Sequence, residues 1–61
     1  MRVQTFMSRV SVESLHQMDV HINDWLTNHQ VEPKLVSQCF GQDKAKDGGS
    51  TEPVVVVSIW Y

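Results

Sequence analysis

The chain has 61 residues, a single cysteine and a formal net charge of −2. A chain of this length forms one domain, close to the lower size limit for folding alone. Because Cys39 is the only cysteine, an intramolecular disulfide and a cysteine-rich zinc site are excluded, which leaves association between copies as the route to added stability. The five basic residues are spread along the chain without the basic stripe of nucleic-acid-binding proteins.

The sequence also lacks the features of a membrane or secreted protein. No apolar run approaches the roughly 20 residues of a membrane-spanning helix. Met1 leads directly into strand-like sequence, without the charged and then apolar opening of a signal peptide. We therefore expect a cytoplasmic protein that binds neither membranes nor nucleic acid.

The first half of the chain predicts a strand followed by an amphipathic helix. Residues 2–7 alternate loosely between apolar and polar side chains, which indicates a strand. Ser8 or Ser11 can cap the next helix; Ser11 is favoured because Glu13 then lies in the first turn, where the helix dipole favours a negative charge. The helix is predicted over residues 12–29. Its apolar face recurs every three or four residues and comprises Val12, Leu15, Met18, Ile22, Trp25 and Leu26, continued by His29.

The second half predicts two strands joined by a long loop. Pro33 ends any helix, because the residue before a proline favours an extended conformation. Residues 34–40 then read as a strand. Residues 41–52 hold all three glycines and much of the charge, and we expect them to form a flexible loop within the single domain 1–61.

The last strand, residues 53–61, is the most apolar segment of the chain. Its four consecutive valines, isoleucine, tryptophan and tyrosine suit a packed sheet, and Pro53 is expected at its first position. Because side chains alternate along a strand, one face carries Val55, Val57, Ile59 and Tyr61. The other face carries Val54, Val56, Ser58 and Trp60. Two largely apolar faces indicate a strand that is covered on both sides.

The order strand, helix, strand, strand predicts an α+β domain. A strand–helix–strand unit makes a right-handed crossover with its two strands parallel, and the third strand returns antiparallel to both. The third strand could lie outside the second or between the other two. We expect it between them, because it is the most apolar, which gives a three-stranded antiparallel sheet of order 1-3-2 with the helix on one face.

One helix covers one sheet face, so the other face is expected to lie at an interface. We predict a non-enzymatic homo-oligomer, a dimer or larger, that associates through the helix-free sheet face or a sheet edge. The predicted interface residues are Val54, Val56, Trp60 and Tyr61.

Two resemblances accompany this prediction. The run Ile22-Asn23-Asp24-Trp25-Leu26, the strand holding Val3 and Phe6, and the ending Val57-Ser58-Ile59-Trp60-Tyr61 resemble a family of small uncharacterised bacterial proteins. That family includes a small sporulation-associated protein. The resemblance spans nearly the whole chain and implies a strand–helix–strand–strand fold without implying a biochemical role.

The element order is also similar to that of dodecins, which are small flavin-storing homo-oligomers. Dodecins stack flavin on a tryptophan of their second strand, whereas here Trp60 lies in the third strand and Trp25 in the helix. The alternative to an interaction module is thus a carrier that holds an aromatic ligand such as flavin between subunits near Trp60. We expect no cofactor.

No residue pattern indicates catalysis or metal binding. His16, His21 and His29 are separated by five and eight residues, which does not give the spacing of two ligands on one helix face. Cys39 lies in a predicted strand, where a cysteine is more often a small buried apolar residue than a nucleophile. The serines lack the flanking glycines of a nucleophile elbow, and the acidic residues are scattered.

Overall fold

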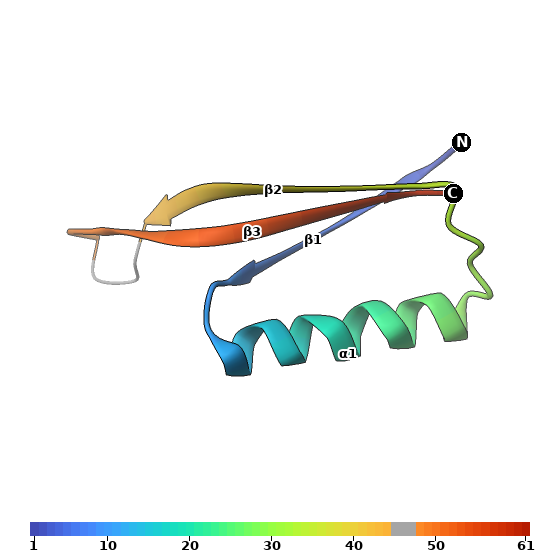
Figure 1. The fold of residues 1–61 in the computed structure, drawn as a ribbon, viewed down its shortest axis with the longest axis horizontal. Helices are drawn as coiled ribbons and strands as arrows, with labels where there is room; N and C mark the ends of the chain where they lie inside the picture. The colour runs from blue at the N-terminus through green and yellow to red at the C-terminus, as the bar shows by residue number, and fades with distance from the viewer. Residues whose placement is uncertain (45–47) are drawn as a thin grey trace.

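A computed structural model describes residues 1–44 and 48–61. The element order is β1 (Val3–Arg9), α1 (Val12–Asn28), β2 (Leu35–Lys44) and β3 (Thr51–Trp60). Within the described residues the strands form one antiparallel sheet of order β1-β3-β2, and α1 lies on one side of it (Figure 1). The predicted α+β fold, with the most apolar strand in the centre, is confirmed.

The two strand ladders keep one register along their whole length. In the first ladder Val3 lies opposite Trp60 and Arg9 opposite Val54; in the second, Leu35 lies opposite Trp60. Beyond the end of β1, Arg2 and Tyr61 exchange both backbone hydrogen bonds, at 2.6 and 2.8 Å. Because bonded pairs alternate in an antiparallel ladder, the odd-numbered residues of β3 bond towards β1 and the even-numbered residues bond towards β2.

The sheet extends further than the sequence predicted, at the expense of the expected loop. β2 continues to Lys44 and β3 begins at Thr51, so a flexible loop over 41–52 is wrong at both ends. The glycine and charged residues there were assigned to a loop by composition, but the continuing ladder supplies partners for their backbone groups. The part of that expected loop at residues 45–47 lies outside the described residues.

Pro53 lies inside β3 and does not start it, contrary to the prediction. Its position is nevertheless compatible with a missing N–H. The odd-numbered residues of β3 bond towards β1, and the β1 ladder has already ended at the pair of Arg9 and Val54. The proline nitrogen therefore faces a side of β3 on which no strand needs a donor.

The interior of the domain is small and is built on β3. Val54, Val55, Val57 and Ile59 are the buried apolar residues of the described chain. The last three face the helix, and the partly buried residues packed against them are Phe6, Leu15, Met18, Ile22 and Trp25. No residue of α1 is itself buried. Val12 was predicted on the packed face but is 88% exposed. It is the first residue of α1, and the helix residues packed against the cluster begin at Leu15.

Both helix ends are capped by local hydrogen bonds. The Ser11 side chain accepts a hydrogen bond from the backbone N–H of Ser14 at 3.1 Å, which confirms the predicted N-cap. At the other end, the N–H of Gln30 bonds the carbonyl of Thr27, and the N–H of Val31 bonds the carbonyl of Leu26. This pair of bonds is the Schellman motif, in which the residue after the cap adopts a left-handed conformation.

We expect Gln30→Gly to raise the stability of the fold. Gln30 has a φ of 51°, a conformation that costs a residue with a Cβ atom about 1 kcal/mol and costs glycine almost nothing. The expected gain in the free energy of unfolding is about 0.5–1 kcal/mol, measured by denaturant titration. Gln30→Ala is the matched control, since alanine keeps the Cβ atom; an equal gain in both variants would contradict the explanation.

Candidate interaction surface

The helix-free face of the sheet is made of cross-strand rows centred on β3. Apolar rows alternate with a polar one: Val3, Trp60 and Leu35 form the first row, and Met7, Val56 and Cys39 form the third. Between them lie Thr5, Ser58 and Ser37, in which the hydroxyl oxygens of Thr5 and Ser58 are 3.4 Å apart. Two apolar bands therefore cross this face on either side of a row of hydroxyl groups.

The flanks of this face are open to solvent. Val3 is 50% exposed, Met7 is 60% exposed and Leu35 is 59% exposed, whereas Val56 and Trp60 between them are partly buried. Cys39 is an exposed free thiol on the same face, so the expectation of a buried cysteine is wrong. Large apolar side chains gathered on one face in this way are typical of an interaction surface.

The structure brings three of the four predicted interface residues onto this face. Val54, Val56 and Trp60 occupy alternate positions of β3 that point away from the helix. Val54 is already only 4% exposed in the single chain, so a partner could bury little more of it. Tyr61 lies on the opposite face, where its ring meets that of Trp25 edge to face with centroids 5.1 Å apart.

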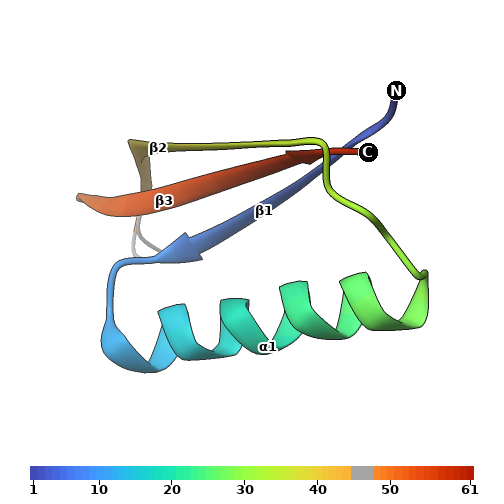
Figure 2. The same ribbon diagram turned by 45° about the vertical axis from the view of Figure 1, so that its right-hand side comes forward.

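A second apolar surface runs along β2, which the prediction named only as a sheet edge. α1 lies under β1 and leaves β2 uncovered on the helix side (Figures 1 and 2). Every residue of β2 is exposed. Val36 and Phe40 lie on the helix side of this strand and are 57% and 70% exposed. The alternation of Leu35, Ser37 and Cys39 against Val36, Gln38 and Phe40 was readable from the sequence, but the lateral position of the helix was not.

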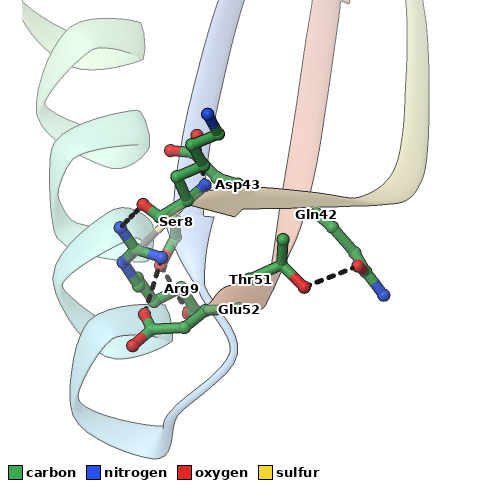
Figure 3. A network of polar contacts seen from close by, with 7 residues as sticks. Ser8, Arg9, Gln42, Asp43, Thr51 and Glu52 are labelled. Atoms are coloured by element: carbon green, nitrogen blue, oxygen red, sulfur yellow. Dashed lines mark hydrogen bonds and ion pairs between the residues drawn. The ribbon is translucent and has the colours of Figure 1, made fainter. Parts of the chain in front are cut away.

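A polar cluster ties the three strands together at the end of the sheet near the β2–β3 connection (Figure 3). Arg9 of β1 forms an ion pair with Glu52 of β3 at 2.6 Å, and its second guanidinium nitrogen donates to the carbonyl of Lys44 at 3.5 Å. The Thr51 hydroxyl donates to the Gln42 side chain at 3.0 Å. This cluster links the β2–β3 end of the sheet to β1.

An open depression of about 680 Å³ lies at the opposite end of the sheet. Its lining combines aromatic and polar side chains and includes Arg2, Gln4, Trp25, His29 and Tyr61. Trp60, the residue expected beside an aromatic ligand, does not line it. The depression is open to solvent, and none of the described residues that line it is a buried polar residue, so it does not by itself define a ligand.

Among residues 1–44 and 48–61 no three histidine, cysteine, aspartate or glutamate side chains are grouped to hold a metal ion. All three histidines are exposed on or just after α1. No helix in the described ranges is long and apolar enough to cross a bilayer.

The total exposed area of the chain is larger than that of a compact monomer of the same mass. A compact monomer of 7.0 kDa exposes about 4,000 Å², whereas this chain exposes 4728 Å². The chain therefore exposes about 700 Å² more than a compact monomer of its mass. The radius of gyration is 13.0 Å, against about 10.5 Å for a compact domain of this length.

Searches with this chain against protein-family models, curated proteins and solved structures find no significant match.

Proposed function

We propose that this protein is a non-enzymatic, cytoplasmic interaction module that works as a homo-oligomer. The observation that carries the proposal is the mismatch between a very small buried interior and large open apolar surfaces. Four residues of the described chain form the buried apolar interior, and all four belong to β3. Val3, Met7, Leu35, Val36 and Phe40 surround that strand with at least half of their surface exposed.

Association with a second copy would add buried apolar surface to a chain whose own buried interior is small. Small domains whose interior is insufficient are stabilised by disulfides, metals or partner subunits. The single cysteine rules out the first within one chain, and the described residues group no metal ligands. A second copy would bury the apolar flanks of the helix-free face or the outer edge of β2.

The oligomeric state tests the proposal directly. We expect light scattering coupled to size-exclusion chromatography to give a mass of at least twice the 7.0 kDa of one chain at micromolar concentration. The thermal midpoint should also rise with protein concentration, because folding and association are then linked. A folded species of 7.0 kDa with a concentration-independent midpoint would refute the proposal.

The partly buried ring of Trp60 favours one alternative, a carrier of an aromatic ligand. Trp60 lies between the exposed side chains of Val3 and Leu35, where a flat ligand could stack on its indole. Quenching of tryptophan fluorescence on adding riboflavin, lost in Trp60→Leu and retained in Trp25→Phe, would support this alternative. Unchanged fluorescence would argue against the carrier and in favour of the interaction module.

A further inference from the structure

The outer edge of β2 carries a row of backbone groups without a strand partner among the described residues. Even-numbered residues of β3 bond towards β2, so in this register their bonded partners on β2 are the odd-numbered ones. The N–H and C=O groups of Val36, Gln38, Phe40 and Gln42 therefore point outwards. Lys44 is the next even-numbered residue of β2. Its N–H donates to the Asp43 side chain at 2.9 Å and not to β3, which agrees with an outward direction for the even-numbered residues.

This edge lacks the features that protect natural sheet edges from pairing. Edge strands are usually short, bulged, charged or interrupted by proline. β2 is ten residues long, keeps one register against β3 and contains no proline. Its charged residues, Asp43 and Lys44, lie together at its far end, and its first eight residues are uncharged.

The other edge of the sheet is less suited to a second copy. Among the three strands, α1 lies closest to β1 (Figure 2). If two copies paired along β1, the strands would be about 4.8 Å apart, and the two helices beneath them would be closer than the 8–10 Å that helix packing requires. β2 lies on the side away from the helix, where a second sheet can approach without this obstruction.

We propose that two copies pair antiparallel along β2, about a two-fold axis at Gln38, to form a continuous six-stranded sheet. This inference rests on the proposed homo-oligomer and specifies its interface. Val36 then lies opposite Phe40 of the second copy, and Phe40 opposite Val36 of the second copy. Each of these pairs, and the central pair of Gln38 residues, exchanges two backbone hydrogen bonds.

The register follows from the outward-pointing groups and from side-chain chemistry. Only even-numbered residues have outward groups, so a two-fold axis must lie at a residue of the strand and not between residues. An axis at Cys39 would place Lys34 opposite Lys44 and leave Phe40 opposite Gln38. An axis at Phe40 would place Val36 opposite Lys44. The axis at Gln38 pairs the exposed apolar residues with each other and avoids like charges, which favours it.

A proline at position 38 tests whether two copies pair through the outer edge of β2. Gln38→Pro removes an N–H that points outwards and takes no part in the ladder with β3, a place where an edge strand tolerates proline. We expect the variant to remain folded by circular dichroism and to run as a monomer in light scattering. Gln38→Ala keeps the N–H and is expected to remain a dimer.

A crosslink tests the register, independently of whether the proline variant folds. With the axis at Gln38, Ser37 lies opposite Cys39 of the second copy in a non-bonded pair, with Cα atoms about 4.5 Å apart, within reach of a disulfide. We expect Ser37→Cys to form a covalent dimer with oxidised glutathione on a non-reducing gel. The wild-type chain should crosslink far less, because its two Cys39 residues are then diagonal neighbours.

The outcomes separate the inference from the proposed function. A wild-type dimer that persists in a folded Gln38→Pro variant would overturn the β2 interface while leaving the homo-oligomer intact. Ready crosslinking of wild type through Cys39, without a gain in Ser37→Cys, would overturn the axis at Gln38. A monomeric wild type would overturn both proposals.

Discussion

Ile59→Ala is expected to unfold most of the protein at room temperature. Ile59 is 3% exposed and lies in the central strand, where it packs within the cluster of Val55 and Val57 under the helix. Replacing a buried isoleucine by alanine costs about 2–5 kcal/mol, since apolar surface is lost and a cavity remains. A core of this size rarely supplies more than about 3–5 kcal/mol in total, so the loss is comparable to the whole stability.

The measurement is a urea titration followed by circular dichroism, at one chain concentration for all variants, because association contributes to apparent stability. Val12→Ala is the control: Val12 is 88% exposed on α1 and lies outside both proposed interfaces. Its expected change is within about 0.5 kcal/mol. If Ile59→Ala lost no more stability than Val12→Ala, the described core would be wrong.

The fold was predictable because strand period, helix period and capping all agree in this sequence. The alternation of apolar residues across β3 correctly separated Val55, Val57 and Ile59 from Val54, Val56 and Trp60. Ser11 was identified as the cap from side-chain chemistry alone, and the central place of β3 followed from its composition. These are local or compositional properties, which a sequence carries directly.

The errors concern features that depend on neighbouring strands. Residues 41–44 and 51–52 look like loop by composition, but backbone pairing between β2 and β3 includes them in the sheet. Pro53 was placed at a strand start, whereas the end of β1 is what makes its internal position tolerable. No pattern within β3 could show that pairing with β1 begins only at Val54, the residue after Pro53.

The candidate surface was predictable in part. The sequence predicted a helix-free sheet face, which the structure has, and it proposed association through that face or through an edge; the structure adds where the exposed apolar area lies. Val54 was expected at the interface but is buried within the chain, and Tyr61 packs on the helix side. The open edge of β2 arises because the helix lies under β1, and its lateral position depends on side-chain packing that periodicity does not encode.

The second large effect is expected from Trp25→Ala, which should separate the helix from the sheet. The Trp25 ring meets Phe6 of β1 with centroids 5.5 Å apart and Tyr61 at the end of the chain at 5.1 Å, both edge to face. Each such aromatic pair contributes about 0.5–1.5 kcal/mol beyond the area that it buries. Together with the lost packing, we expect a destabilisation of about 3–5 kcal/mol, near the stability of the domain.

The aromatic geometry is separated from simple bulk by Trp25→Leu and Trp25→Phe. Leucine keeps an apolar side chain but no ring, whereas phenylalanine keeps a smaller ring that can still contact Phe6 and Tyr61. We expect stability to fall in the order wild type, phenylalanine, leucine and alanine, measured by urea titration at fixed concentration. Because Trp25 lies outside both proposed interfaces, the oligomeric mass of the folded fraction should not change. A Trp25→Leu variant as stable as wild type would show that apolar bulk without a ring is enough to attach the helix. A folded but monomeric Trp25 variant would show that the helix side of the sheet also contributes to association.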